Sequence, residues 1–382
     1  LQATGIKGGL VIHVGCGVLH ANATEALREV AELTCCPVTT SWGARAAMDE
    51  RDDHILPMIY MDTVNRARRE ADLVLVVGSR LGETDWWGKA PYWGKPDEQK
   101  LIQVDIDPET IGSNRRADLA VQADADRFLR ALATELGRGP TPSLTARQKH
   151  LDGLRAKAAA ERRKLDKHLA NKGVPMVSAH AAAVCREFFG DDAIAVLDGG
   201  NTAVWGHMFW EVRQTNTLLQ TAKMGMLGAG IAQAIGAQVA HPDRQVICLI
   251  GDGAMGFHFQ EVETALRNGL PVIYIVLCDK QWGMVKMNQQ FTLRPVKTLI
   301  YKTLDEGETI NTDFHETEFD VVARGMGAYG ERVADPEGLA GALRRAQASR
   351  KCAVIHVDVD PVKHMWAPGL RAFKDMHQEP AG

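Results

Sequence analysis

Two acidic residues of this 382-residue sequence stand where they could hold a divalent metal ion. Asp252 lies within Gly-Asp-Gly (251–253) directly after the apolar run VICLI, and Asp279 follows the next apolar run, IYIVL. The carboxyl ends of neighbouring parallel strands lie at one edge of a sheet, so the two carboxylates should converge there. Oxygen ligands, small glycines and the free amides of the following helix predict a site for Mg²⁺ bound to a diphosphate. The competing interpretation is a pair of solvated acids at two strand ends.

The elements that would position these residues form two sets of alternating strands and helices. In the first set, nearly continuous apolar runs end in turn residues, which indicates a parallel sheet covered on both faces. The predicted strands lie within residues 8–17, 37–42, 71–80 and 100–108, and a closing helix ends near residue 137. We therefore expect a central α/β domain over residues 1–137.

A Pro/Gly/Ser/Thr-rich break follows, and then a run of charged helix formers that predicts an exposed connecting helix within a linker, residues 138–174. The second set of strands, AIAVLDGGN, RQVICLIGDGA, LPVIYIVLCDK and CAVIHVDVDP, predicts another α/β domain over residues 175–362. The expected fold class is thus α/β, with two doubly wound parallel-sheet domains joined by a helical linker. The apolar and aromatic tail, residues 363–382, should dock, either as a lid beside the carboxyl edge of the sheet or as a contact with a neighbouring subunit.

Composition excludes several classes of partner. Lys and Arg number 44 against 48 Asp and Glu, a net charge of −4, so no basic field favours nucleic acid. No run of about 18 apolar residues predicts a membrane span. The seven cysteines show no paired metal or disulfide spacing, which indicates a reducing, cytoplasmic location. Because the chain begins with Leu1, we expect it to be a fragment of a longer protein.

Several motifs in order resemble one family. The segment from Gly251 to Val285, GDGAMGFHFQEVETALRNGLPVIYIVLCDKQWGMV, resembles the thiamine diphosphate motif of the acetolactate synthase and 2-oxo-acid decarboxylase superfamily. Residues 8–137 resemble the central domain of that family through VIHVGCG, DLVLVVGSRL and IQVDIDPETIG, and residues 175–362 resemble its C-terminal diphosphate-binding domain. The N-terminal pyrimidine-binding domain of the family has no counterpart, so it is expected from a missing segment or a partner chain.

The resemblance implies three metal ligands, namely Asp252, Asp279 and the backbone carbonyl of Gln281. The sequence departs from the family here, because Cys278 and Asp279 stand where most relatives have two asparagines. A second carboxylate should tighten metal binding but repel the diphosphate, unless a cation such as Lys280 offsets the charge.

The resemblance also implies how the cofactor is held. Asn201 and Thr202 occupy the turn that touches the diphosphate, the carbonyl of Gly225 would accept from the aminopyrimidine, and the amide of Leu227 would face its ring. The Leu227 side chain would prop the cofactor in the bent form that its activation requires. The alternative for this loop is a glycine-rich helix start that packs on a neighbour. The remaining implied cofactor contacts are Met226, Gly251, Gly253, Ala254, Trp282, Gly283 and Met284.

The implied activity is that of a thiamine-diphosphate-dependent lyase or carboligase acting on a 2-oxo acid or a related small molecule, with Leu227, Gln281 and Asn288 contributing to catalysis. Acetolactate synthases usually have tryptophan where this chain has Asn288, which suggests a more polar acceptor site. The activating glutamate of the family lies in the pyrimidine domain, so this chain alone should not turn over, and a homodimer or homotetramer is expected. The alternatives are an acyl-CoA lyase or decarboxylase, and a non-catalytic cofactor-binding protein.

The central domain leaves two questions open. Its GCG turn and the acidic strand end VDIDP could hold FAD or the adenosine of CoA, but a lone GxG is weak and many relatives keep VDIDP without a ligand. Trp86, Trp87, Tyr92 and Trp93 could stack on an adenine, or the loop that carries them could pack on its own aromatic side chains.

Overall fold

The computed structural model describes residues 9–138, 144–221, 225–305, 307–376 and 378–380, without the side chains of residues 371, 373 and 374. The chain divides into two compact units. The first comprises Leu1–Lys164, Val212–Asn216 and Arg371–Gly382, and the second comprises Leu165–Glu211 and Thr217–Leu370. Each unit is described by itself.

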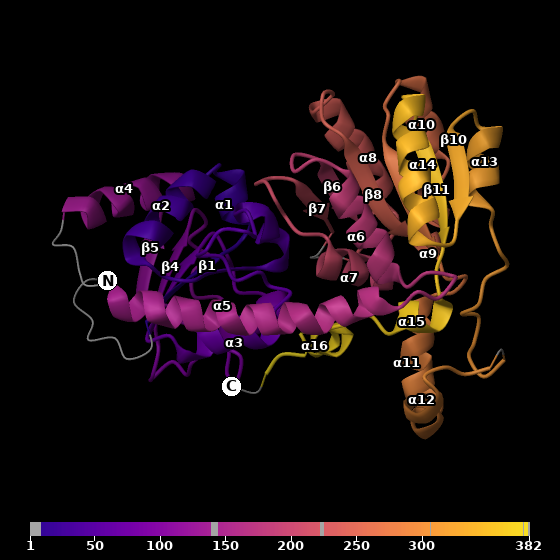
Figure 1. Ribbon diagram of the computed structural model, residues 1–382. Helices are drawn as coiled ribbons and strands as arrows, with labels where there is room; N and C mark the ends of the chain where they lie inside the picture. The colour runs from indigo at the N-terminus through magenta and orange to yellow at the C-terminus, as the bar shows by residue number, and fades with distance from the viewer. Residues whose placement is uncertain (1–8, 139–143, 222–224, 306, 377, 381–382) are drawn as a thin grey trace. The chain divides into compact units, whose positions relative to one another are not determined.

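The first unit contains a five-stranded parallel sheet in the order β2-β1-β3-β4-β5. Figure 1 labels its strands β1, β4 and β5. Its strands are β1 (Leu10–Val14), β2 (Val38–Thr40), β3 (Leu73–Val77), β4 (Lys100–Asp105) and β5 (Leu119–Gln122). Its helices are α1 (Cys16–His20), α2 (Thr24–Thr34), α3 (Met61–Glu70), α4 (Ala125–Arg138) and α5 (Thr145–Leu165), with 3₁₀ turns η1 (Trp42–Ala47) and η2 (Glu83–Gly88).

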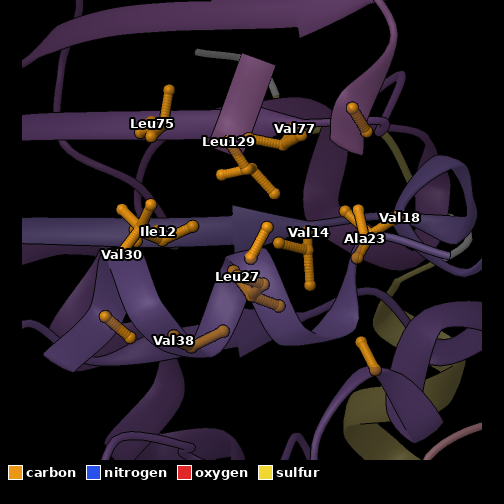
Figure 2. Packing of buried hydrophobic residues seen from close by; sticks show 14 of the residues in the cluster. Ile12, Val14, Val18, Ala23, Leu27, Val30, Val38, Leu75, Val77 and Leu129 are labelled. Atoms are coloured by element: carbon orange, nitrogen blue, oxygen red, sulfur yellow. The ribbon is translucent and has the colours of Figure 1, made fainter. Parts of the chain in front are cut away.

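Helices α2 and α4 pack against β1 and β3 through fully buried aliphatic side chains (Figure 2). Ile12 and Val14 of β1, Leu27 of α2, Leu75 of β3 and Leu129 of α4 are all 0% exposed. Apolar side chains recur on one face of each helix, so burying that face against the sheet supplies the main stabilisation.

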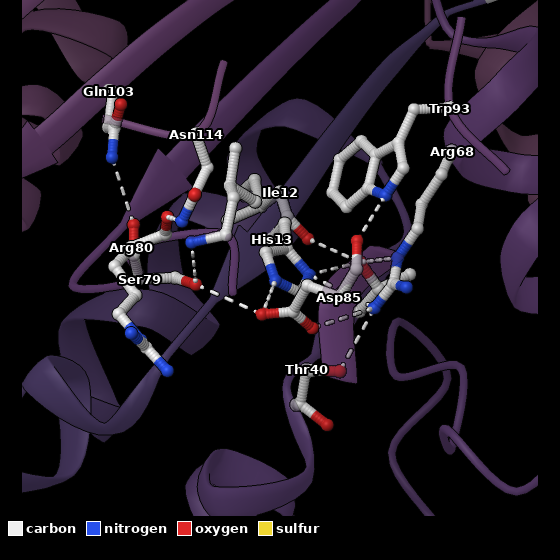
Figure 3. A network of polar contacts seen from close by, with 12 residues as sticks. Ile12, His13, Thr40, Arg68, Ser79, Arg80, Asp85, Trp93, Gln103 and Asn114 are labelled. Atoms are coloured by element: carbon white, nitrogen blue, oxygen red, sulfur yellow. Dashed lines mark hydrogen bonds and ion pairs between the residues drawn. The ribbon is translucent and has the colours of Figure 1, made fainter. Parts of the chain in front are cut away.

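A buried polar network links the strand ends of this unit (Figure 3). The Asp85 carboxylate lies 3.4 Å from Nε2 of His13 and accepts from the Ser79 hydroxyl at 3.2 Å. Arg68 contacts Nδ1 of His13 at 3.2 Å, and its guanidinium lies over the ring of Trp93. These groups are nearly inaccessible to water, so each depends on the others for its hydrogen bonds.

Helix α5 lies within the segment expected to join the domains. The expectation of an exposed helix was wrong for one of its faces, because Leu151 and Leu154 are buried and Glu161 accepts from the hydroxyl and the backbone amide of Thr63. The helix therefore belongs to the first unit over almost all of its length.

The second unit contains a six-stranded parallel sheet in the order β10-β11-β9-β8-β6-β7. Its strands are β6 (Ile194–Leu197), β7 (Leu218–Gln220), β8 (Val246–Gly251), β9 (Ile273–Cys278), β10 (Tyr329–Val333) and β11 (Ala353–Asp358). The longer helices beside it are α6 (Ser178–Phe188), α7 (Gly200–Phe209), α8 (Ala229–Ala240), α11 (Gly283–Leu293) and α14 (Pro336–Ser349). The shorter helices are η3 (Asp166–Ala170), α9 (Asp252–His258), α10 (Glu261–Arg267), α12 (Pro295–Tyr301), α13 (Phe319–Gly325), α15 (Pro361–Met365) and α16 (Leu370–Asp375), the last of which crosses the boundary between the units.

Both sheets contain only parallel pairs among the described strands, and helices flank each of them. The predicted fold class is confirmed. The tail is docked as expected, since Met365, Leu370 and Met376 are at most 5% exposed; the side chain of Phe373, an apolar residue of the same tail, lies outside the described residues.

Candidate functional site

Three neighbouring strands of the second unit end in acidic residues at the same edge of the sheet. Strands β6, β8 and β9 are adjacent and parallel. The residues that directly follow them are, in the same order, Asp198, Asp252 and Asp279. The backbone nitrogen of Lys280 donates to Oδ2 of Asp252 at 2.7 Å, so the turns after β8 and β9 touch directly. The convergence expected from the spacing is confirmed by this geometry.

The two candidate metal ligands form a buried, mutually repelling pair. Asp252 is 7% exposed and Asp279 is 6% exposed. Burial, which disfavours the charged form, raises the pKa of Asp252 to about 7, and the negative charge of Asp279 adds to the shift. Burial likewise raises the pKa of Asp279 to about 7, against hydrogen bonds such as that from Gln281. A divalent cation would supply the positive charge that this pair lacks.

An unsatisfied amide lies beside the carboxylates. Asn201 is 4% exposed, and neither its Oδ1 nor its Nδ2 atom has a hydrogen-bond partner among the described residues. A Cβ atom built on Gly283 would lie 2.7 Å from Nδ2 of Asn201 and 3.0 Å from Oδ2 of Asp279. A buried amide without partners is costly, so this position favours a bound polar group. The donors and acceptors present thus fit a metal-diphosphate group.

The ammonium of Lys280, which was expected to offset the charge of the second carboxylate, pairs with a different acidic residue. The ammonium of Lys280 pairs with Glu316 at 3.0 Å, and only the backbone nitrogen of Lys280 faces Asp252. Lys280 adopts a left-handed conformation, with φ of 59°, which allows its backbone and side chain to serve these two partners. The structure therefore does not bear out a direct role for this ammonium at the carboxylate pair.

Gln281 connects the metal turn, by which we mean the touching turns after β8 and β9 that carry Asp252 and Asp279, to the segment that follows β11. Its side-chain amide donates to Oδ2 of Asp279 at 3.1 Å and to the carbonyl of Pro361 at 2.9 Å. Its own carbonyl, the candidate metal ligand, accepts from the amide of Gly283 at 2.9 Å. A carbonyl oxygen has two lone pairs, so this contact leaves one for a cation.

Thr202 lies beside Gly251, the residue before Asp252. The side chain is 2% exposed, and its Oγ1 atom would lie 3.0 Å from a Cβ atom built on Gly251. The same oxygen lies 3.4 Å from Nε2 of His364, a tail residue that the sequence reasoning missed. Asn201 and Thr202 are thus brought to the edge that carries Asp252.

The loop expected to receive the pyrimidine is only partly buried. Gly225 has φ of 56° and Met226 is 56% exposed, whereas Leu227 packs against the core of the sheet. Gly228 also has a positive φ, and a Cβ atom there would lie 2.8 Å from Cβ of Phe257. This close approach fixes the loop against α9, whose first residue is Asp252.

The predicted site residues that follow Asp279 divide into those that pack against glycines of the site and one that is exposed. The ring of Trp282 covers Gly253 and meets Phe314 edge-on at 4.7 Å, and Met284 lies within contact distance of Gly200. Asn288, by contrast, is exposed on α11. Ala254 is buried in α9, one turn of backbone beyond Gly251.

A cavity of about 440 Å³ opens beside the metal turn, on the side of α13 (Phe319–Gly325). Asp252, Gly253 and Trp282 contribute to its wall, together with residues that the sequence reasoning did not single out. Most of these are aromatic or polar: Phe257, Phe259, Phe314, His315, Glu316, Phe319 and His356. Lys280, which the sequence analysis named as a possible counter-charge, also lines the cavity. The volume suits a small organic molecule.

A second acidic cluster borders this cavity. Ligand atoms of Glu316, His356 and Asp358 lie within 4.8 Å of one another. Arg332 donates to Asp358 at 2.7 Å and to Glu316 at 2.5 Å, and Lys280 also pairs with Glu316. Cations of the protein already neutralise these carboxylates, so the cluster lacks the excess negative charge that favours a metal ion.

Two family models match the chain in the order of its two domains. "Thiamine pyrophosphate enzyme, central domain" matches residues 9–132, and "Thiamine pyrophosphate enzyme, C-terminal TPP binding domain" matches residues 198–357, which together cover about three quarters of the chain. The chain belongs to the thiamine pyrophosphate enzymes. The resemblance inferred from the sequence is confirmed.

The curated relatives of this thiamine pyrophosphate enzyme include several acetolactate synthases. The isozyme 2 large subunit of Escherichia coli (strain K12) is 26% identical over 362 residues, which is 93% of this chain and 61% of the relative. The acetolactate synthase of Mycobacterium bovis is 28% identical over 356 residues, 90% of this chain and 54% of the relative. The acetolactate synthase large subunit of Haemophilus influenzae is 26% identical over 368 residues, which is 94% of this chain and 61% of the relative. The chain therefore spans little more than half the length of these relatives.

The glycine turn of the central domain of this thiamine pyrophosphate enzyme has a packing role. A Cβ atom on Gly15 would lie 2.2 Å from the carbonyl of Gly78, and one on Gly17 would lie 2.7 Å from Cα of Gly78. The turns after β1 and β3 thus touch backbone to backbone. Asp105 and Asp107 at the end of β4 accept from backbone amides two residues later. These contacts explain the residue types without an adenosine.

The aromatic loop of the same domain packs on itself. The rings of Trp86 and Tyr92 stack with centroids 3.5 Å apart, and Trp93 donates its indole N–H to the carbonyl of Asp85 at 2.7 Å. Trp86 and Trp87 both adopt left-handed backbone conformations. Of the two interpretations offered by the sequence, these contacts favour the self-packed loop.

No helix among the described residues is both long enough and apolar enough to span a membrane.

Proposed function

We propose that this chain provides the central and diphosphate-binding domains of a thiamine-diphosphate-dependent carbon–carbon lyase or carboligase that acts on a 2-oxo acid. The observation that carries the proposal is the buried pair Asp252 and Asp279 beside the unpartnered amide of Asn201. Two buried carboxylates destabilise the fold unless a cation neutralises them, and a buried amide destabilises it unless a polar group accepts its hydrogen bonds. A bound cation and a bound anion would supply both partners.

The residues have separate tasks in this proposal. Asp252, Asp279 and the carbonyl of Gln281 would hold Mg²⁺, while Asn201 and Thr202 would donate to the diphosphate. The site of Mg²⁺ and the assignment of these side chains rest on the donor set and on the family. Thiamine diphosphate supplies, when bound, the electron sink that carbon–carbon cleavage next to a carbonyl requires.

The remaining residues would orient the ring and exclude water. The carbonyl of Gly225 would accept from the amino group of the pyrimidine, and Leu227, which packs on the core, would keep the two rings of the cofactor close. Trp282 and the aromatic wall of the neighbouring cavity would keep water from the reacting atoms. Asn288, exposed on α11, would lie on the acceptor side.

We propose further that the activating glutamate comes from a pyrimidine-binding domain, either elsewhere in the full-length protein or on a partner chain. The chain alone would then bind the diphosphate without turning over. A cytoplasmic homodimer or homotetramer fits such a shared site, and the segments 1–137, 138–174, 175–362 and 363–382 would be its domain plan. Neither FAD nor the adenosine of CoA is required by this proposal.

Calorimetry tests the proposal directly. Thiamine diphosphate should bind the full-length protein only with Mg²⁺ present, and Asp252→Ala should abolish that binding because it removes one of few protein ligands. Asp243→Ala, a substitution of an exposed acid before β8, is the matched control and should leave binding unchanged. Equal affinity in Asp252→Ala and the wild type would contradict the site. Turnover of pyruvate, oxalyl-CoA and a 2-hydroxyacyl-CoA would then separate a 2-oxo-acid enzyme from the acyl-CoA alternatives, and loss of all three with intact binding would favour a non-catalytic protein.

A further inference from the structure

His364 is a buried histidine at the proposed diphosphate site. It lies in α15 (Pro361–Met365), which directly follows β11, and its side chain is 3% exposed. The carboxylate of Asp360 caps this helix by accepting from the amide of Lys363 at 2.9 Å. Because β11 is parallel to β8 and β9, α15 begins at the same sheet edge as the metal turn.

Three contacts fix the position of His364. Its Nδ1 atom lies 2.6 Å from the hydroxyl oxygen of Ser178, at the start of α6. Its Nε2 atom lies 3.4 Å from Oγ1 of Thr202, in the first turn of α7. Its backbone carbonyl accepts from the indole N–H of Trp205 at 2.8 Å. The imidazole thus lies between two hydroxyl groups, and only that of Thr202 faces the metal turn.

The protonation pattern of the imidazole determines what the Thr202 hydroxyl can do. A neutral imidazole has one donor and one acceptor nitrogen. If Ser178 donates to Nδ1, then Nε2 carries the proton and donates to Thr202, so the hydroxyl proton of Thr202 remains available. With the opposite tautomer, Nε2 would accept that proton, and Thr202 could offer a phosphate oxygen only its lone pairs.

We propose that His364 is a positioning residue for the diphosphate, which donates from Nε2 to Thr202 and thereby leaves the Thr202 hydroxyl free to donate to a phosphate oxygen. The inference rests on the proposed function and assigns the tail a role within that site. The short Ser178 contact favours the required tautomer, because it gives Nδ1 a close hydroxyl donor. An anion next to Thr202 favours it too, since a hydroxyl stabilises a phosphate only by donating.

Two amide substitutions separate the contacts of His364. Glutamine places its amide nitrogen near the position of Nε2, whereas asparagine places it near Nδ1. We expect His364→Asn to raise the dissociation constant of thiamine diphosphate, measured with Mg²⁺ in the full-length protein, by roughly three- to tenfold. His364→Gln should stay within about twofold of the wild type. Thr202→Val should match His364→Asn, and the double variant should lose no more than either single variant, because both remove the same interaction.

The tautomer provides a second readout, independent of turnover. In protein labelled with ¹⁵N-histidine, with the His364 signals assigned from their loss in His364→Gln, the bound form should show a protonated Nε2 and an unprotonated Nδ1. A protonated Nδ1, equal affinities of the two amide variants, or additive losses in the double variant would each overturn the role of His364 while the wild type still binds. Failure of the wild type to bind thiamine diphosphate would overturn the proposed function, and this inference with it.

Discussion

Oδ2 of Asp198 accepts a hydrogen bond from the backbone nitrogen of Gly230 at 2.7 Å, across 32 positions of the sequence. Asp198 also accepts from the amide of Gly199, at the turn that leads to Asn201. One buried carboxylate therefore joins the proposed diphosphate turn to the start of α8, immediately after the loop that carries Leu227. This side chain therefore fixes the proposed diphosphate turn relative to the loop that carries Leu227.

Asp198→Asn should lower the free energy of unfolding by roughly 1–3 kcal/mol, because an amide offers one oxygen where two backbone amides need acceptors. Thiamine diphosphate binding should weaken as the turn and the loop separate. Urea unfolding and calorimetry measure the two effects. Asp192→Asn, at the exposed opposite end of β6, serves as the control; a similar loss in both variants would count against a specific role of Asp198.

Asp279→Asn should stabilise the metal-free protein at pH 8. Burial places the folded pKa values of both carboxyls at about 7, above the ordinary 3.8, and the Asp279 charge adds to the shift of Asp252. The folded state therefore binds more protons than the unfolded state between these two values. The stability contributed by the pair is present below about pH 4 and is lost as the pH rises through about 7. Removing one charge should therefore raise the free energy of unfolding at pH 8 by about 1–3 kcal/mol, with a smaller gain at pH 5 and none below about pH 4. A lower melting temperature in Asp279→Asn at pH 8 would argue against repulsion in this pair.

Metal affinity should depend on pH through the same two carboxyls. Cation binding requires both to be ionised, so the Mg²⁺ affinity of the wild type should rise between pH 6 and pH 8 and binding should release protons. The rise should be shallower in Asp279→Asn, which retains one titrating ligand. Titrations in two buffers of different ionisation enthalpy count the protons, and parallel pH profiles of the two proteins would contradict the coupling.

Leu227→Ala should separate cofactor binding from turnover. The substitution removes a few methylene contacts worth roughly 0.8 kcal/mol each, so thiamine diphosphate affinity should fall modestly. Turnover in the full-length protein should fall further, because the shorter side chain no longer props the cofactor. Leu227→Met is the matched control, since it keeps most of the volume. A collapse of affinity with a normal rate per bound cofactor would make Leu227 a packing residue.

The first unit should lose stability in acid through His13. Burial lowers the pKa of His13 below 6.5, so the unfolded state binds its proton first, and stability falls as the pH drops below about 6.5. Burial alone would raise the pKa of Asp85, but the charges of His13 and Arg68 lower it, so its contribution is lost only at more acidic pH. From pH 7 to pH 5, His13→Asn should lose less stability than the wild type in urea unfolding, with a difference of up to about 2 kcal/mol. The exposed His20→Asn should behave as wild type, and an equal acid loss in all three proteins would refute the assignment.

Strand order explains why part of the site could be predicted from the sequence. Asp252 and Asp279 each follow an apolar run. Two neighbouring parallel strands place the residues after their carboxyl ends close together, and this does not depend on the rest of the fold. The short edge strands β5, β7 and β10 were not predicted, because LAVQ is only four residues long and YGERV carries two charges, so neither stands out as an apolar run.

Contacts between distant segments could not be predicted in the same way. His364 meets Ser178 across 186 positions, and that meeting depends on how a five-residue helix packs after the last strand. The pairing of Lys280 with Glu316 likewise depends on the path of the irregular segment before α13. Local sequence can indicate that such residues are charged or polar, but only tertiary packing decides which partner each one finds.

The two partners of Lys280 connect the cavity to the metal turn. Its amide holds Asp252, its ammonium holds Glu316, and Glu316 is shared with Arg332. We expect a molecule that enters the cavity and displaces Glu316 to change the energy of the turn that carries Asp252. By reciprocity, occupancy of the metal position must change the affinity of the cavity by the same factor. An inhibitor directed at this cavity would therefore act as an antagonist or a synergist of magnesium, according to whether it separates Lys280 from Glu316 or clamps the two together.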